Sequence, residues 1–226
     1  MLKEKNSLKE KKVNPLTAID AVIIPPSHIL NLATNLSQRL SRTSPFVLNT
    51  ENRFPHISIL MGYINNDSEA SKTIAKIGRK RLPIDLIISR IEQEENEFDG
   101  KYFYHLVIEP NDQLLEIQSQ LIDELSRVED VFPTQEAYIV EPKETIVSDV
   151  INYVKTFDDY QGGADKYNPH ITLGAGEKGL SFEDFNLPVK FTADSIALCQ
   201  LGNYCTCRRI LSLYGQTKAN FSSRQK

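Results

Sequence analysis

Two short stretches decide how this chain folds: Phe54-Pro55-His56-Ile57-Ser58-Ile59-Leu60 and Asn168-Pro169-His170-Ile171-Thr172-Leu173-Gly174. In each stretch a histidine follows a proline, and a hydroxyl residue stands two positions after the histidine. Apolar residues fill the alternate positions, which is typical of a half-buried β-strand. Because strand side chains alternate between two faces, we expect each strand to bury its apolar face and to present His with Ser or Thr on the other.

The segments around these stretches predict a similar order of elements in the two halves of the chain. The first half should hold strands at 18–24, 56–64 and 82–92 and helices at 68–78 and 27–42, the latter with Ser27 as N-cap. The second half should hold strands at 102–109, 170–173, 189–199 and 204–214, a helix capped by Asn111 or Asp112, and a helix at 144–157.

This order predicts an α+β fold with mainly antiparallel sheets, because hairpins are mixed with helices. Two similar halves facing each other would leave a groove, and pockets are common at such junctions. The expected domain covers 18–216, between frayed tails at 1–17 and 217–226.

Charge and composition limit the kinds of partner. The formal net charge is −4, which argues against binding extended nucleic acid, where many phosphates must be neutralised. A small phosphate ester in a locally basic cleft stays compatible with it. The basic run Gly78-Arg79-Lys80-Arg81 is best explained as a helix end favoured by the helix dipole. No stretch is long and apolar enough to cross a membrane, and the first residues lack a secretory signal, so we expect a cytoplasmic protein.

The cysteines Cys199, Cys205 and Cys207 all lie near the end of the chain. An odd number without a secretion signal predicts reduced thiols. Cys205 and Cys207 would share a face if both lie on a strand. Zinc would need further ligands at suitable spacing, and none is nearby, so we expect no metal site here.

The paired motif suits the cleavage of a phosphate ester. In-line cleavage needs a base on the incoming oxygen and an acid on the leaving oxygen, and imidazole can do both near neutral pH. The hydroxyls of Ser58 and Thr172 could donate to the non-bridging oxygens as charge develops. A single His-x-Ser/Thr triplet arises often by chance, but two copies, both led by proline and in matching positions, favour a site with His56 and His170 as the acid–base pair.

Pro-His-Ile-Ser-Ile-Leu and Tyr-Asn-Pro-His-Ile-Thr-Leu-Gly resemble the paired motifs of the two-histidine (2H) phosphoesterases, the superfamily of the 2′,5′-RNA ligase-like proteins and cyclic phosphodiesterases. The hairpin segment Leu201-Gly202-Asn203-Tyr204-Cys205-Thr206-Cys207-Arg208 also resembles the closing hairpin of some bacterial members. The resemblance implies two pseudo-symmetric lobes, each a mainly antiparallel sheet with helices on its outer face, around a central cleft.

The resemblance also implies an activity: metal-independent hydrolysis of a 2′,3′-cyclic phosphate or a 2′,5′-phosphodiester of a small nucleotide or RNA end, in some members with reverse ligation. It requires no cofactor. His56 and His170 are then catalytic, and Ser58 and Thr172 hold the phosphate. Members often carry an Arg or an aromatic residue just after a motif, whereas Met61-Gly62 and Ala175-Gly176 stand there in this chain.

Several other residues could line the site. Tyr204, by its hairpin, is the first choice to stack on a base, ahead of Tyr63 and Tyr167, although each is better explained by packing. Arg208 could reach the phosphate. His105 shares a strand face with apolar residues, so a packed, hydrogen-bonded histidine is favoured over a third imidazole in the site.

Two other functions remain open at this level. A non-catalytic protein could use the same cleft to bind a nucleotide or RNA end, because a fold does not guarantee chemistry. A metal hydrolase could use the histidines as ligands, but no carboxylate-rich cluster stands beside either motif.

Overall fold

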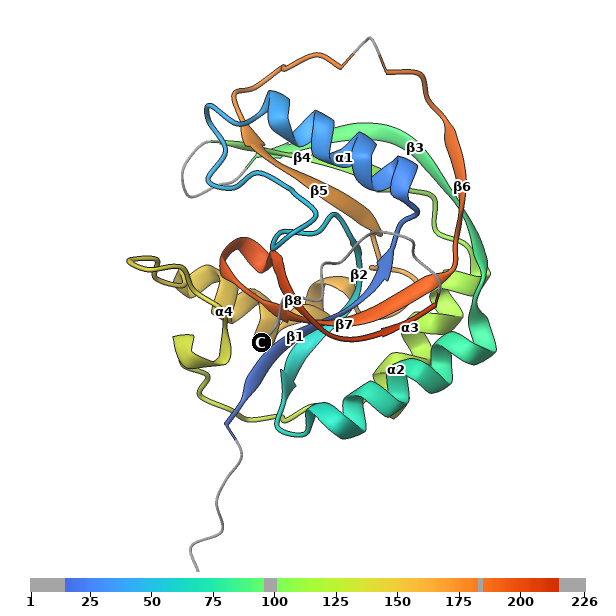
Figure 1. Ribbon diagram of the computed structural model, residues 1–226, viewed down its shortest axis with the longest axis vertical. Helices are drawn as coiled ribbons and strands as arrows, with labels where there is room; N and C mark the ends of the chain where they lie inside the picture. Colours follow the sequence, from blue (N-terminus) through green and yellow to red (C-terminus); the bar gives the residue numbers. More distant parts are fainter. Residues whose placement is uncertain (1–14, 96–100, 183–184, 216–226) are drawn as a thin grey trace, which may run out of the picture.

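The computed structural model describes residues 15–95, 101–182 and 185–215, and its strands form two sheets of four (Figure 1). The first sheet has the order β2 (Ile57–Ile64), β1 (Thr17–Ile24), β7 (Ser195–Leu201) and β8 (Cys207–Tyr214). The second has the order β5 (His170–Gly176), β4 (Tyr102–Ile108), β3 (Ile84–Glu95) and β6 (Val189–Ala193). Every neighbouring pair is antiparallel, which confirms the predicted α+β fold with antiparallel sheets.

The helices pack on both sheets. They are α1 (Ser27–Arg39), α2 (Asp67–Arg81), α3 (Asp112–Glu124), α4 (Ser148–Lys155) and α5 (Phe157–Gln161), with short 3₁₀ turns η1 (Gln135–Ala137) and η2 (Asn203–Cys205). Helix α2 contacts β7 and β8, α3 and α4 contact β2, and α1 contacts β5 of the second sheet. Figure 1 shows α2 and α3 on the side of the first sheet that faces away from the second. Asn66 and Asn111 cap α2 and α3 through their side chains, and the basic run ends α2 as expected.

The two sheets are not the two halves of the sequence. Strands β7 and β8, from the end of the chain, join β1 and β2, whereas β3 crosses to the second sheet. The two motif strands nevertheless hold matching places, since each is an edge strand of its sheet. β2 pairs with β1, and β5 pairs with β4. The predicted duplication in element order is therefore realised with strands exchanged between the lobes.

The strand expected at 189–199 is two strands, so that prediction is corrected. β6 is an edge strand of the second sheet and alternates between buried and exposed residues, whereas every residue of β7 is buried inside the first sheet. The chain passes from one sheet to the other at Asp194, which belongs to neither strand. Apolar residues recur on both sides of Asp194, so their pattern does not by itself reveal such a change of sheet.

Two helix predictions are also corrected. Ser27 does not cap α1; the N-cap is Pro26, whose carbonyl accepts from the amides of Ile29 and Leu30. The helix expected at 144–157 begins only at Ser148, and it is split because Thr156 leaves helical geometry (φ −110°, ψ 21°) between α4 and α5.

The apolar faces of the motif strands form part of the core, as predicted. Ile57, Ile59, Ile171 and Leu173 are fully buried. Burying each such side chain contributes roughly 1.5–3 kcal/mol. Strong burial of this face fixes the register of each motif strand, since a slip of one residue would exchange its two faces.

The prediction of three reduced thiols is wrong for two of them. Cys199 in β7 and Cys207 in β8 form a disulfide across the hairpin, with their Cα atoms 5.6 Å apart. Cys205 carries a free thiol, and it lies in η2 rather than on a strand with Cys207. Among the described residues, no helix is both long and apolar enough to span a bilayer.

Candidate active site

The two motif histidines sit at equivalent places where the sheets meet. His56 immediately precedes β2 and His170 is the first residue of β5, and these two strands contact each other (Figure 1). The segment before β5 is tied to β2, because the Tyr167 hydroxyl donates to the carbonyl of Ser58 at 2.8 Å. The structure thus brings the two motifs, more than 100 residues apart in sequence, to one place.

Both motif strands carry an irregularity at the same position. In β2 the pairing with β1 passes over Ile59, the residue after Ser58, and in β5 the pairing with β4 passes over Leu173, the residue after Thr172. Such bulges bend a strand locally, re-aim its side chains and are common beside active sites. The repeat of this detail shows that the likeness of the two lobes extends to the geometry of the motif.

The two histidines make the same hydrogen bond. Nδ1 of His56 lies 2.6 Å from the carbonyl of Phe54, and Nδ1 of His170 lies 2.7 Å from the carbonyl of Asn168. A carbonyl oxygen can only accept, so Nδ1 carries hydrogen in both rings. In the neutral imidazole the lone pair is then on Nε2. In both residues Nε2 is therefore the nitrogen that could accept or give a proton.

Burial favours the neutral form of these imidazoles. The side chain of His56 is 13% exposed, and burial lowers its pKa to about 4. Burial also lowers the pKa of His170, while its hydrogen bond to the Asn168 carbonyl and the carboxylates Glu94 and Glu92 counteract this change. The charges around the two rings therefore differ: acidic residues of β3 favour the imidazolium of His170.

Asp20 is a member of the site that sequence analysis missed. It lies in β1 and is fully buried, and its Oδ2 accepts from the Ser58 hydroxyl at 2.6 Å and lies 3.6 Å from Nε2 of His56. A signal for it was present, since Asp20 is the one charged residue within the apolar strand 18–24. A buried carboxylate in such a strand needs a partner or a function.

His105 is also closer to the chemistry than expected. Its Nδ1 lies 3.2 Å from the Thr172 hydroxyl, so the histidine is hydrogen-bonded as expected, but it also lies beside the motif, which was the less favoured alternative. Its ring also lies edge-on to the His170 ring, with centroids 4.4 Å apart. Burial, with the nearby His170, lowers its pKa well below the ordinary value. The site therefore contains a third, neutral imidazole.

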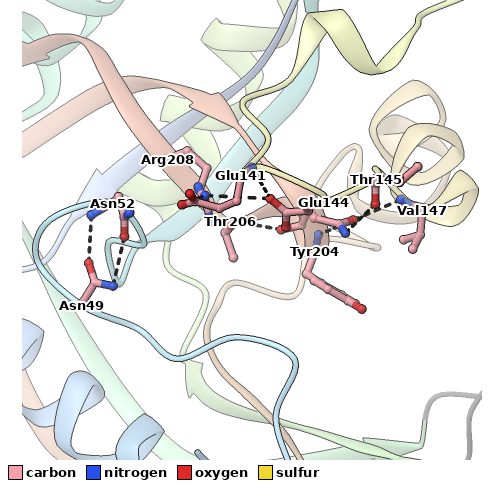
Figure 2. A network of polar contacts seen from close by, with 10 residues as sticks. Asn49, Asn52, Glu141, Glu144, Thr145, Val147, Tyr204, Thr206 and Arg208 are labelled. Carbon is pink, nitrogen blue, oxygen red and sulfur yellow. Dashed lines mark hydrogen bonds and ion pairs between the residues drawn. The ribbon is translucent and has the colours of Figure 1, made fainter.

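The residues predicted to grip substrate from the closing hairpin are placed differently. The Arg208 side chain is 2% exposed and forms ion pairs with Glu141 and Glu144 (Figure 2). The segment before His56 touches the same hairpin, because the Phe54 amide donates to the Cys207 carbonyl at 3.2 Å. Arg208 is thus near the first motif, but its charge is directed to the two glutamates. Its predicted contact with phosphate stays a prediction.

The predicted stacking of a base on Tyr204 stays a prediction, and two other tyrosines are buried. The ring of Tyr204 is partly buried, lies 5.8 Å from the Phe46 ring, and points away from the Arg208 ion pairs in Figure 2. Tyr63 and Tyr167 are 2% and 5% exposed, so they are packing residues.

A set of hydrogen bonds holds the two motif segments in register. Gln118 of α3 donates from one side-chain amide to the carbonyls of Ile59 and Gln161, and the Gln161 side chain accepts from the Asn168 amide at 2.9 Å. With the Tyr167 bond to Ser58, these contacts join β2 to the segment that leads into His170. We infer that they fix the separation of the two imidazoles.

Replacing Tyr167 by Phe is expected to lower the free energy of unfolding by about 0.5–1.5 kcal/mol, because the part-buried hydrogen bond from its hydroxyl to the Ser58 carbonyl is lost. Chemical denaturation of the two proteins measures this difference. Tyr160→Phe is a matched control, since Tyr160 is 62% exposed and should change stability by less than about 0.5 kcal/mol. Equal stability of Tyr167→Phe and the wild type would show that this contact does not hold the segments together.

No family model matches the sequence. No curated protein matches it either. Among solved structures, TT0787 of Thermus thermophilus aligns with a TM-score of 0.46 and 13% identity over 88% of this chain and 97% of its own. E. coli LigT in its apo form aligns with a TM-score of 0.44 and 13% identity over 90% of this chain and 99% of its own. A protein described as a phosphoesterase aligns with a TM-score of 0.43 and 11% identity over 89% of this chain and 99% of its own. We therefore argue the function from the residues of this chain.

The described residues of the site could together perform acid–base chemistry. Two imidazoles present Nε2, and two hydroxyls lie one on each motif strand, beside Asp20 and His105. In the described part of the chain, no group of three or more His, Cys, Asp or Glu side chains is arranged to hold a metal ion.

Proposed function

We propose that this protein is a phosphodiesterase of the two-histidine (2H) type that acts without a metal ion. Its substrate would be a 2′,3′-cyclic phosphate or a 2′,5′-phosphodiester of a small nucleotide or RNA end, with reverse ligation by the same groups. The observation that carries the proposal is the identical geometry of the two motifs, in which each Nδ1 donates to the carbonyl two residues earlier and leaves Nε2 for proton transfer.

Hydrolysis of a cyclic phosphate illustrates the proposed roles. Nε2 of His56 takes a proton from the attacking water as its oxygen bonds to phosphorus. The bond between phosphorus and one ring oxygen breaks, and Nε2 of His170 gives that oxygen a proton. The hydroxyls of Ser58 and Thr172 donate to the non-bridging oxygens, where negative charge develops. In the reverse direction the two histidines exchange roles.

The charges near each ring support this assignment of acid and base. Glu92 and Glu94 favour the protonated form of His170, which suits the general acid. The pKa of His56 is lowered to about 4 by burial and by the nearby His170, which suits a base that is neutral before water attacks. If His170 is the protonated general acid, His56 is the neutral histidine and acts as the general base.

The optimum of kcat/KM is expected between pH 4 and pH 6.5. The lower limit is the pKa of His56, and the upper limit is the ordinary histidine pKa of 6.5, because the pKa of His170 lies below that value. Activity should fall below this range as His56 gains a proton, and above it as His170 loses the proton that it must donate. A pH–rate profile at low substrate concentration reads both limbs for the free enzyme. An optimum above neutrality would contradict the assignment.

The experiment that tests the function measures turnover of a panel in EDTA. The panel holds 2′,3′-cyclic mononucleotides, 2′,5′-linked oligoadenylates and cyclic dinucleotides, and His170→Ala serves as control. We expect cleavage by the wild type and not by the variant. Loss of wild-type activity in EDTA would overturn metal independence, and tight binding of a nucleotide without cleavage would favour the non-catalytic alternative.

The other expectations belong to the same proposal. A small nucleotide or RNA end is the proposed partner, in preference to extended nucleic acid, and the cytoplasm is the proposed location. Gel filtration with a labelled cyclic nucleotide and with a long single-stranded RNA would distinguish a small nucleotide partner from extended nucleic acid. Only the small nucleotide should comigrate with the protein at physiological salt.

A further inference from the structure

Asp20 is the buried titratable group that the proposed mechanism leaves unused. It lies in the middle of β1, between Ile19 and Ala21, and has no exposed surface. Its Oδ2 lies 2.6 Å from the Ser58 hydroxyl and 3.6 Å from Nε2 of His56. Its Oδ1 is buried and has no hydrogen-bond partner among the described residues.

The proton on this carboxyl group decides what the Ser58 hydroxyl can do. A hydroxyl has one hydrogen to donate and can accept at its oxygen. If Asp20 is ionised, it can only accept, so the hydrogen of Ser58 points at Asp20. If Asp20 is protonated, its O–H can donate to the Ser58 oxygen, and the hydrogen of Ser58 is then available to a phosphate oxygen.

The surroundings favour the protonated form. A fully buried carboxylate with one oxygen unpartnered is costly as an anion, and a neutral acid lowers this cost. Burial accordingly raises the pKa of Asp20 well above its ordinary value, although the Ser58 hydroxyl and the backbone of Ile59 act in the opposite direction. An O···O distance of 2.6 Å is compatible with either direction of the bond to Ser58.

We propose that Asp20 is a positioning residue for the phosphate, and that its proton determines whether the Ser58 hydroxyl can donate to a phosphate oxygen. This inference rests on the proposed function. It adds a third condition for activity to the two set by the histidines: Asp20 must be protonated when substrate binds. Activity is then present below the pH at which Asp20 ionises and is lost above it.

Other titratable groups of the described chain also face Asp20. They are His56 before β2, Tyr153 of α4, Tyr167 before β5 and Cys205 of η2. Burial raises the pKa of both tyrosines and of the Cys205 thiol, so all three stay neutral in the range of interest. His56, whose pKa is lowered to about 4, is neutral there as well.

The test compares pH–rate profiles of the wild type and Asp20→Asn on a substrate that the wild type cleaves. The asparagine amide donates to Ser58 at every pH, as protonated Asp20 does. We therefore expect kcat/KM of Asp20→Asn to stay within about threefold of the wild-type value at acidic pH, since the asparagine keeps a donor to Ser58. On the alkaline side the wild type should lose two protons and the variant one, so log(kcat/KM) falls with slope −2 and −1 respectively.

Two further variants separate positioning from a structural role. Ser58→Ala should lower kcat/KM by about 10²–10³-fold at acidic pH, where protonated Asp20 leaves the Ser58 hydroxyl free to donate, and by less on the alkaline side. In the Ser58→Ala background, Asp20→Asn should no longer change the alkaline slope. Asp85→Asn is the matched control, because exposed Asp85 accepts from Thr192 at 2.6 Å on the far side of the second sheet. It should keep the wild-type profile.

The outcomes are distinguishable. Equal alkaline slopes in the wild type and Asp20→Asn would overturn the role of Asp20 and leave the proposed function intact. No turnover of the panel by the wild type would overturn both. If Asp20→Asn does not fold, infrared spectra of the wild type against pH still decide: a protonated carboxyl band that persists through the active range supports the proposal, and its absence there overturns it.

Discussion

Replacing either motif histidine by alanine is expected to lower kcat/KM by about 10²–10⁴-fold, the usual contribution of a positioned acid or base. His56→Ala removes the group that takes the proton of the attacking water, and His170→Ala removes the group that protonates the leaving oxygen. Because each Nδ1 bonds to a nearby carbonyl of its own segment, neither change should unfold the protein. Steady-state turnover of a panel substrate measures the effect.

His28 provides the matched control for these two variants. It is the exposed histidine near the start of α1, so His28→Ala should retain wild-type turnover. Circular dichroism and thermal unfolding of all three variants would confirm that the fold is kept. Activity of His56→Ala within a few-fold of the wild type, in a folded protein, would remove His56 from the mechanism.

Removing the hydroxyls of the motifs gives the second large effect. Ser58→Ala and Thr172→Val should each lower kcat by about 10²–10³-fold, the usual cost of losing one donor to a developing oxyanion. Each hydroxyl lies on a motif strand two residues after the histidine, and β2 and β5 contact each other, so both can face one phosphate. Kinetics on the same substrate measure the losses in kcat and in KM separately.

Thr192→Val is the control for Thr172→Val. Thr192 lies on the edge strand β6, and its hydroxyl donates to exposed Asp85 of β3 at 2.6 Å. Loss of the Thr192 hydroxyl should therefore leave kcat unchanged. A higher KM with unchanged kcat in Ser58→Ala or Thr172→Val would mean that the hydroxyl binds substrate equally in the ground state and the transition state. That result would contradict the proposed stabilisation of charge.

The motif strands were predictable because both the chemistry and the packing act locally. Alternation placed Ile57 and Ile171 in the core and His with Ser or Thr on the other face, and the structure confirms the burial. Helices α2 and α3 were likewise predictable from apolar spacing and from caps such as Asn111. These features depend on residues a few positions apart, which a single sequence displays directly.

The exchange of strands between lobes was not predictable in this way. Whether β3 and β7 join the sheet of their own half or the other depends on contacts between distant segments, and a buried strand looks the same in either sheet. The change of sheet at Asp194 has the same cause. The disulfide between Cys199 and Cys207 also depends on hairpin register, which the spacing of the cysteines does not reveal.

The residues behind the motif were the hardest part of the site to predict. Asp20 and His105 contact Ser58 and Thr172 from strands that are distant in sequence. Arg208 was expected at the phosphate from its place in the hairpin. Its ion pairs with Glu141 and Glu144 join segments that are more than 60 residues apart, so they could not be foreseen. A motif gives the reacting groups, and only the fold gives their neighbours.

The most direct test of the central claim is turnover of one 2′,3′-cyclic nucleotide in EDTA by four proteins: the wild type, His56→Ala, His170→Ala and the double variant. The two histidines are proposed to act in one step on one phosphorus, so we expect the double variant to be about as slow as the slower single variant. Losses that multiply in the double variant, or a wild type that is inactive without metal, would contradict the two-histidine mechanism.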